Sequence, residues 1–504
     1  MIKKQKIKNN NPQTPADASL ALIGRHRELE LLETFWSSKF PEFLAVYGRR
    51  RIGKTFLITE FIKHKGPYLK ITGSKNAPLS EQLTNFMEAL SHTFYQGAPL
   101  ATPKSWREAF KHLTKAVKEL VPGGTPFVLF LDELPWLAGK KSRLLEMLDY
   151  FWNTEWSLMP PFKLIACGSA ASWMLENLVQ ATGGLHNRLT RTLLLKPFNL
   201  AETHVFLQEL GFKYSPAQTL SITMAIGGVA HYLKLLSKDL SPAQNIQALC
   251  FSEQALLKDE FPKIFKALFD QAEDNQKIIQ VLAQSHQGLQ RSEIAKTTQL
   301  SSGGTLTKRL EELEAAGFIK GIVPYGNEKK EQQFRVIDNY SLFYMHWIFP
   351  LSQQLALRPD YWQEQLNTPK FYQWSGYAFE NICFQEAWQI AKALKINDVV
   401  SFMNNWRSKN NNNQTSGSAA EIDLVFIRKD KMATLCEIKF NHEIFTIDKN
   451  YAANLMNKLA RFKQSHPEFE KVELAFITYK GLKENIWSQE LVDRQITAAD
   501  LFKV

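Results

Sequence analysis

The sequence predicts an α/β protein of several domains, with a parallel sheet near its amino end and a smaller α/β unit at its carboxyl end. The first observation is a series of apolar runs, FLAVY, YLKITG, FVLFLD, KLIACGS and TLLLKPF, that alternate with helical segments between about Leu20 and Phe198. Such continuous apolar runs are typical of parallel strands that are buried on both faces. The second is the length of 504 residues, which is enough for roughly three domains. The third is a strand-rich segment that closes the chain.

The composition restricts the partners and the compartment. Lys and Arg number 61 against 50 Asp and Glu, and the net charge of +11 favours an anionic partner such as nucleic acid without establishing one. Residues 1–18 are basic and polar and predict a disordered tail, and no segment is apolar over a transmembrane length, so no membrane partner is expected. Four widely spaced cysteines predict neither a zinc site nor a disulfide framework and fit the cytoplasm: Cys167, Cys250, Cys383 and Cys436.

The strongest motif is GRRRIGKT, which satisfies G-x-x-x-x-G-K-[ST] between the strand FLAVY and the helical TFLITEFI in the predicted core, residues 19–198. Its glycines let backbone N–H groups wrap phosphates, and the helix N-terminus adds its positive dipole end. Lys54 is expected to reach the β and γ phosphates of a nucleotide, and Thr55 to hold Mg²⁺. The residues predicted to bind the nucleotide here are Gly48, Arg49, Arg50, Arg51, Ile52, Gly53, Lys54, Thr55 and Phe56.

Two acids follow a buried strand in FVLFLDELPWL, where ionised groups are costly unless they serve a site. Asp132 is expected to position Mg²⁺ and Glu133 to orient or deprotonate the attacking water, the alternative being that both only cap the next helix. Ser169, at the end of the strand LIACGS, is placed to sense the γ phosphate. Arg188 and Arg191 in HNRLTRT are candidates for the cation that neutralises transition-state charge, although either could equally be a surface arginine.

After the core, residues 199–268 read as helical and open on a good helix cap in NLAETHVFLQELG, which predicts a small lid. Residues 269–350 then give three helices and a hairpin, the pattern of a winged helix. Its third helix would enter the major groove of DNA, but it also carries Glu311, Glu312 and Glu314, so a purely structural use stays equally open. The residues expected nearest to DNA are Thr305, Thr307, Lys308 and Arg309, with Lys329 and Lys330 on the wing.

An aromatic-rich connector, residues 351–370, leads into a last unit, residues 371–504, that reads helix, strand, strand, strand, helix, strand. The run SKNNNNQTSGS, 408–418, predicts a mobile loop. In the hairpin that follows, Glu437 and Lys439 share one face of a strand.

If this hairpin turns at residues 429–431, Asp423 falls opposite Glu437, because each lies seven positions from Asp430. Like charges directly opposite repel each other, and a divalent cation held by both carboxylates would offset the repulsion. A solvated hairpin face is the alternative.

Five segments, LIGRHRELE, YGRRRIGKT, FLDELPWL, CGSAASWM and GGVAHYL, occur in that order and resemble the archaeal-type ATPases of the AAA-related, signal-transducing (STAND) P-loop class. The resemblance covers nearly the whole chain, because these ATPases often continue into a winged helix and a domain resembling restriction nucleases. It implies ATP and Mg²⁺ as ligands, with Ile23, Gly24 and Arg25 near the adenine. Ala230 stands where the family usually has proline, and Asn187-Arg188 where a Gly-Arg pair is common, which leaves the nucleotide and the arginine assignment open.

The order of elements in the last unit, with D…E-x-K, resembles the PD-(D/E)xK nuclease fold. This resemblance implies that Asp423 and Glu437 bind a second Mg²⁺ or Mn²⁺, that Lys439 assists the attacking water, and that Glu380 on the opening helix completes the site. The predicted function is an ATP-driven switch that controls a metal-dependent nuclease acting on DNA, with RNA also open. The alternative is a regulatory ATPase whose last domain binds nucleic acid or a partner protein without cleaving, and an oligomer is compatible with both.

Overall fold

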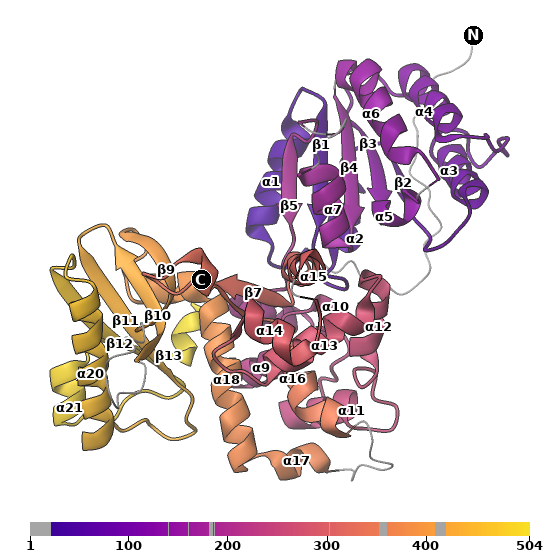
Figure 1. Cartoon of the computed structure of the whole chain (residues 1–504). Helices are drawn as coiled ribbons and strands as arrows, with labels where there is room; N and C mark the ends of the chain where they lie inside the picture. Colours follow the sequence, from indigo (N-terminus) through magenta and orange to yellow (C-terminus); the bar gives the residue numbers. More distant parts are fainter. Residues whose placement is uncertain are drawn as a thin grey trace.

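The computed structural model describes residues 22–503 except 140, 160, 181–184, 186, 302, 352–359 and 409–419. The predicted basic tail, most of the predicted mobile loop and part of the connector therefore lie outside the described residues. Two sheets lie at opposite ends of the molecule, and a largely helical region separates them (Figure 1). Within the described ranges, every helix is too short or too polar to cross a membrane.

The first sheet has five parallel strands in the order β2-β3-β4-β1-β5, and all five predicted apolar runs form its strands. Helices α3, α4 and α6 cover one face and α1 and α2 the other. Because β1 lies between β4 and β5, the loop after β1 emerges beside the carboxyl end of β4. The elements are α1 (His26–Ser37), β1 (Glu42–Tyr47), α2 (Lys54–Ile62), β2 (Tyr68–Thr72), α3 (Leu79–Phe94), α4 (Trp106–Leu120), β3 (Phe127–Asp132), α5 (Leu134–Leu137), α6 (Leu144–Thr154), β4 (Phe162–Gly168), α7 (Ala171–Met174) and β5 (Arg191–Leu194).

A helical segment follows, and its first helix has the cap that the sequence predicts. The side chain of Asn199 accepts the N–H of Glu202 at 2.8 Å, and Glu202 accepts the N–H of Asn199 at 3.0 Å, which forms a capping box. The helices are α8 (Leu200–Glu209), α9 (Pro216–Ile226), α10 (Ala230–Leu233), α11 (Pro242–Cys250) and α12 (Glu260–Leu268).

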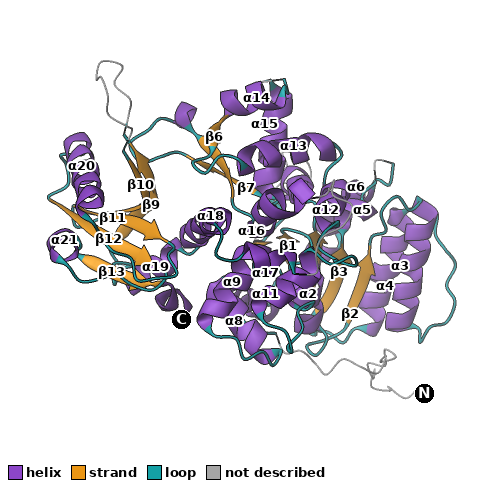
Figure 2. Cartoon of the chain, turned by 90° about the horizontal axis from the view of Figure 1, so that it is seen from below, coloured by secondary structure: helices purple, strands orange, loops and turns teal. Residues whose placement is uncertain are grey.

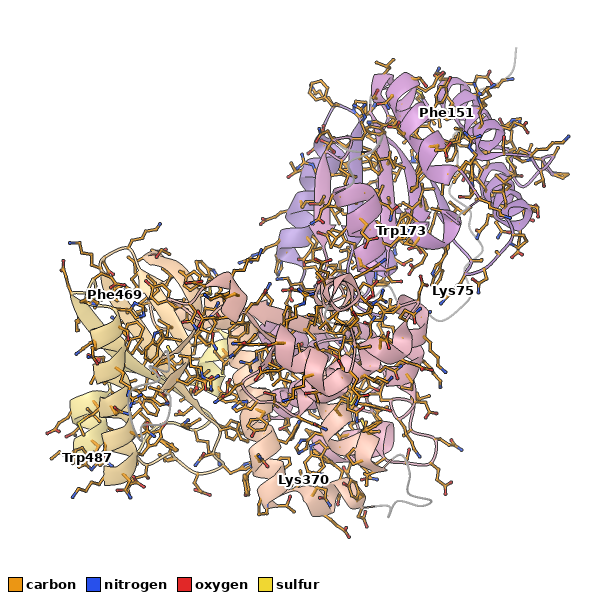
Figure 3. All side chains as sticks on the ribbon, viewed as in Figure 1. Lys75, Phe151, Trp173, Lys370, Phe469 and Trp487 are labelled. Carbon is orange, nitrogen blue, oxygen red and sulfur yellow. The ribbon has the colours of Figure 1, made fainter. Side chains whose placement is uncertain are left out.

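The next segment, here called the middle unit, has the three helices and the hairpin, β7–β8, expected within residues 269–350, and a short further strand, β6, pairs with β8 to give an antiparallel sheet of order β6-β8-β7. Its third helix, α15, packs against α7 of the first sheet, near Trp173 (Figures 1 and 3). The elements are α13 (Ala272–Ala283), β6 (Leu289–Gln290), α14 (Arg291–Thr298), α15 (Gly304–Ala315), β7 (Ile319–Ile322) and β8 (Gln333–Val336).

The packing of α15 corrects one expectation about DNA. Arg309 is buried and lies 2.9 Å from Glu312 of the same helix, so in this structure it cannot face DNA. The hairpin between β7 and β8 is also engaged, because Tyr325 donates its N–H at 2.9 Å to the carbonyl of Asn405 in β9 (Val400–Arg407), a strand of the second sheet. The middle unit therefore contacts the units of both large sheets, through α15 on one side and through the β7–β8 hairpin on the other.

The second sheet has the order β13-β12-β11-β10-β9, with β11, β12 and β13 parallel and the β9-β10-β11 pairs antiparallel. Strand β13 at its edge is an element that the sequence did not predict. The elements are α16 (Asn339–Phe343), α17 (Tyr361–Gln365), α18 (Pro369–Gln385), α19 (Ala387–Ala393), β9 (Val400–Arg407), β10 (Glu421–Arg428), β11 (Met432–Lys439), α20 (Lys449–Ser465), β12 (Lys471–Thr478), α21 (Ile486–Leu491) and β13 (Arg494–Thr497).

The β10–β11 hairpin has the predicted register. Its loop consists of residues 429–431, and Leu424 pairs with Cys436, so one further step along the strands puts Asp423 opposite Glu437. Lys431 has φ of 59°, the left-handed conformation that often closes a three-residue hairpin loop.

A single hydrophobic core extends from α8 through the middle unit to the second sheet. The carboxyl end of the chain belongs to this core, since the ring of Phe502 lies 5.4 Å from that of His204 in α8. Helix α18 runs between the second sheet and the helices α9 and α16 (Figure 2). Changes at the helical segment can therefore reach the second sheet through packed contacts.

A buried carboxylate joins α18 to the helical segment. Glu386, directly after α18, accepts the N–H of Leu200 at the start of α8 at 2.7 Å. Burial, with a smaller contribution from Glu202, raises the pKa of Glu386 to about 7 from an ordinary 4.5. Between these pH values the folded protein holds a proton that the unfolded chain releases, so stability falls as pH rises from 4.5 to 7.

We predict that Glu386→Gln reduces this pH dependence, because an amide cannot ionise and its oxygen can still accept the Leu200 N–H. The urea midpoint of the variant should rise relative to wild type as pH goes from 5 to 8. Glu209→Gln, at an exposed position at the end of α8, is the control. If the urea midpoints of wild type and Glu386→Gln change with pH in the same way, Glu386 is not the group that causes this loss of stability.

Candidate functional site

The loop after β1 has the backbone that the glycine-rich motif requires. Gly48 and Gly53 have φ of 143° and 95°, and a Cβ on Gly48 would lie 2.2 Å from the carbonyl oxygen of Leu195. Lys54 curls back over the loop and donates to the carbonyl oxygens of Gly48 and Arg49 at 2.9 Å each. Burial lowers the pKa of Lys54. The loop therefore holds its lysine at the place where phosphates are expected.

Asp132 and Thr55, the two residues expected to serve a Mg²⁺ ion, lie in hydrogen-bond contact beside this loop. The hydroxyl of Thr55 donates to the Asp132 carboxylate, 2.9 Å from Oδ1 and 3.0 Å from Oδ2, and the hydroxyl of Thr72 lies 3.3 Å from Oδ2. Asp132 is buried at the end of β3. A hydroxyl and a carboxylate oxygen side by side are suitable donors for a Mg²⁺ that keeps several waters.

Glu133 is fixed between the ends of β3 and β4. Its Oε2 accepts the N–H of Ser169 at 3.1 Å and the Ser169 hydroxyl at 2.8 Å. Although it precedes α5, its side chain accepts no capping hydrogen bond from that helix, so the alternative that it only caps a helix is wrong. Glu133 and Ser169 thus form one polar pair at the carboxyl edge of the sheet.

The predicted adenine-side residues connect the start of the chain to the helical segment. Gly24 and Arg25 both have left-handed backbones, with φ of 65° and 61°. Arg25 donates to the carbonyl oxygen of Lys196 at 2.7 Å, and its guanidinium lies 4.3 Å from the ring of Phe198. Its N–H donates to Glu202 at 3.2 Å. A contact of Ile23, Gly24 or Arg25 with adenine stays a prediction.

The three consecutive arginines of the loop meet three different elements. Arg49 is buried and forms an ion pair with Asp338, the residue that caps α16. The guanidinium of Arg50 lies 5.8 Å from the ring of Trp136. Arg51 forms a 2.8 Å ion pair with Glu260 of α12. The loop between β1 and α2, residues 48–53, is called the phosphate loop from here on. It is held by α12 of the helical segment and by Asp338, which follows the middle unit. Two further residues of the segment 48–56 were predicted to bind the nucleotide. Of these, Ile52 is buried and Phe56 is exposed.

Arg188 is a correction. It precedes β5, which runs parallel to β1 with Arg191 beside Leu44, so it lies at the amino edge of the sheet. The phosphate loop is at the carboxyl edge, one strand length away. Arg188 is exposed and lies 3.8 Å from Asp149. It cannot contact a nucleotide bound to its own chain, and Arg191 has the same restriction.

The second sheet carries a separate polar cluster around the β10–β11 hairpin. Glu437 is fully buried, so the alternative of a solvated hairpin face is wrong. Its Oε1 accepts Lys458 of α20 at 2.5 Å, and its Oε2 accepts the Tyr451 hydroxyl at 2.9 Å. The ammonium of Lys439 lies 3.7 Å from Oε2.

Asp423 lies beside Glu437 and accepts the N–H of Ile438 at 2.8 Å. Burial raises the pKa of Asp423 well above its ordinary value, and the charges of Glu437 and Glu380 act in the same direction. Asp423 also lines a cavity of about 210 Å³. The other residues that line this cavity are Gln287, Ala420, Glu421, Asn454, Asn457 and Lys458.

Glu380 does not complete a three-carboxylate site in this structure. Its carboxylate lies 3.2 Å from Arg335 of β8 and 2.9 Å from His286. Within the described ranges, no three His, Cys, Asp or Glu side chains are grouped to hold a metal ion. Asp423 and Glu437 alone still suit Mg²⁺, which is commonly bound through one or two carboxylates with water.

Sequence reasoning missed Lys458 and Tyr451. Both lie on α20, seven positions apart, which puts them on one helix face. The available signal was this spacing of polar groups on the helix that follows the E-x-K strand.

Comparisons with known proteins found one family match, which includes the loop after β1. Residues 22–236 match the family described as "ATPase domain predominantly from Archaea". The chain is 22% identical over 428 residues to the uncharacterized protein MJECL04 of Methanocaldococcus jannaschii, a match that covers 83% of this chain and 87% of that protein. Over 43 residues it is 44% identical to the uncharacterized ATP-binding protein MJ0423 of the same organism, covering 8% of this chain and 73% of that one.

Two solved structures resemble parts of the chain. The Walker-type ATPase of Pyrococcus abyssi aligns with a TM-score of 0.48 and 18% identity, covering 64% of this chain and 96% of that one. The ORC2 protein of Aeropyrum pernix aligns with a TM-score of 0.42 and 14% identity, covering 67% of this chain and 95% of that one.

We predict that Asp338→Asn destabilises the nucleotide-free protein by about 3 kcal/mol, because it leaves the buried Arg49 guanidinium without its counter-ion. The side chain can still cap α16. The double variant Arg49→Met/Asp338→Asn should recover part of the loss in urea unfolding, with Asp360→Asn as the exposed control. Equal midpoints for Asp338→Asn and wild type would show that the pair contributes nothing.

Proposed function

We propose, from the premise that residues 22–236 form an ATPase domain of the archaeal-type P-loop family, that the loop of residues 48–56 binds ATP with Mg²⁺ and that the domain hydrolyses it. The observation that carries this proposal is the meeting of Thr55 with Asp132, and of Glu133 with Ser169, beside that loop. Mg²⁺, when bound, supplies positive charge to the phosphates. Thr55 and Asp132 are the residues suited to hold it.

In the proposed hydrolysis, each side chain has one task. Lys54 leaves the carbonyl oxygens of its loop and donates to the phosphates. Glu133, oriented by Ser169, accepts a proton from the water that attacks the γ-phosphorus. The bond from this phosphorus to the bridging oxygen breaks, which yields ADP and phosphate.

We predict that Lys54→Ala weakens ATP binding at least about a hundredfold, because it removes the cation that faces the β and γ phosphates. Glu133→Gln should keep ATP binding and lose turnover, because the amide cannot accept the water's proton. Nucleotide binding is measured by calorimetry and hydrolysis by phosphate release, with Lys63→Ala, a half-buried position directly after α2, as a control. Wild-type turnover in both Lys54→Ala and Glu133→Gln would exclude this site.

We further propose that the second sheet holds a metal-dependent nuclease-like site controlled by the ATPase domain. The supporting observation is the pair of half-buried Asp423 and buried Glu437 with Lys439 beside it. In such a site, water attacks a phosphodiester phosphorus and the bond to one ester oxygen breaks. Lys439 would orient the water. The positive net charge suits a polyanionic substrate, and we propose DNA, with RNA also open.

The route of control that we propose is α18. Asn381 of α18 donates to Asn339 at 2.7 Å, directly after Asp338, which holds Arg49 of the phosphate loop. Glu380, one residue earlier on α18, forms an ion pair with Arg335, and its charge raises the pKa of Asp423. A nucleotide that moves Arg49 would therefore shift α18 and change the surroundings of Asp423.

We predict that Asp423→Asn abolishes metal-dependent cleavage of a labelled oligonucleotide while ATP hydrolysis remains within about twofold of wild type, because the two sites use separate side chains. Cleavage is assayed with Mg²⁺ or Mn²⁺, with and without ATP. If wild type cleaves neither DNA nor RNA under any of these conditions, the alternative of a regulatory ATPase with a non-cleaving binding domain holds instead.

A further inference from the structure

Lys458 occupies one of the two carboxylate oxygens with which Glu437 could bind a metal ion. Its ammonium lies 2.5 Å from Oε1, while Tyr451 holds Oε2 at 2.9 Å. An ammonium at 2.5 Å and a divalent cation on the same oxygen repel each other. An ion that bridges Glu437 and Asp423 through Oε1 therefore competes with Lys458.

The displaced side chain has a defined place to go. Lys458 and Asp423 line the same cavity of about 210 Å³, in which the amides of Asn454 and Asn457 lie on the same helix as Lys458. Ammonium and amide N–H groups are donors that suit phosphate oxygens. Glu421 and Asp423 also line the cavity, so an anion is repelled there until a cation neutralises the carboxylates.

We propose that Lys458 is a phosphodiester ligand of the second site, held by Glu437 in the metal-free protein and released to the nucleic-acid backbone when a divalent ion binds. This inference rests on the proposed metal-dependent function of the second sheet. It also fixes an order of binding, in which the ion comes first and the phosphodiester second. A flexible four-carbon stem allows the ammonium to make this change.

If Lys458 is instead a fixed counter-ion of Glu437, the opposite effect on metal-ion affinity is expected. If Lys458 only neutralises the buried Glu437, its removal leaves an uncompensated carboxylate, which takes up a proton and weakens ion binding or leaves it unchanged. If Lys458 competes with the ion, its removal strengthens ion binding. The sign of the change in affinity distinguishes the two roles.

The test uses the full-length, nucleotide-free protein with Lys458→Met and Lys458→Gln, and exposed Lys463→Met on the same helix as control. Calorimetry with Mn²⁺ should give about tenfold tighter binding in both Lys458 variants, the factor that one charge-assisted hydrogen bond commonly contributes. Asp423→Asn serves as the blank for ions bound elsewhere. The glutamine variant keeps a donor near Glu437 and decides the result if the methionine variant does not fold.

The second readout is binding of a fluorescent single-stranded oligonucleotide in the presence of Ca²⁺. Both Lys458 variants should bind about tenfold more weakly, with a salt dependence lower by about one counter-ion. Lys463→Met should match wild type in both readouts. Unchanged or weaker Mn²⁺ binding in the Lys458 variants, with normal binding in wild type, would overturn this inference alone. Absence of Asp423-dependent Mn²⁺ binding in wild type would overturn the proposed metal site and this inference together.

Discussion

The buried ion pair between Arg49 and Asp338 is the contact on which the arrangement of this protein depends. It joins the phosphate loop to a residue 289 positions later in the chain, across the boundary between the first sheet and the shared core. Within the described ranges, the Nε and Nη2 atoms of Arg49 have no hydrogen-bond partner. A buried guanidinium that is only partly satisfied is costly, so a phosphate near the loop would offer it further partners. The pair therefore links the occupancy of the loop to the position of α16.

Helix α18 extends this link to the second sheet. It contacts the start of α16 through Asn381 and the start of α8 through the adjacent Glu386, and it packs against β11, where the charge of Glu380 raises the pKa of Asp423. Two residues expected near the nucleotide are thus connected to α18. Arg49 is connected through Asp338 at the start of α16, and Arg25 through Glu202 of α8. The shared core that surrounds α18 is close-packed, and such packing transmits displacement instead of absorbing it.

The sequence was sufficient where the determinants are local. The phosphate loop, the strand ends at Asp132 and Ser169, and the hairpin register at Asp423 and Glu437 follow from spacing within a few residues. The parallel sheet followed from its apolar runs.

The missing features depend on long-range contacts. Arg188 was misplaced because the direction of β5 beside β1 puts its start at the far edge of the sheet. Glu380 and Arg309 were expected at ligand sites, but Arg335, His286 and the packing of α15 engage them. Lys458 reaches Glu437 from α20, and although the spacing of Tyr451 and Lys458 marks one face of that helix, only the tertiary packing decides that this face meets Glu437.

The central claim is that a nucleotide bound at the first sheet changes the conformation of the second sheet through α18. Hydrogen exchange of the backbone amides in 369–386 and 432–439 tests it most directly, with Glu133→Gln protein measured with and without ATP and Lys54→Ala as the non-binding control. The account predicts that ATP changes the exchange rates of both segments in Glu133→Gln and of neither in Lys54→Ala. Changes confined to the phosphate loop and α8–α12, with both segments unaltered, would contradict it.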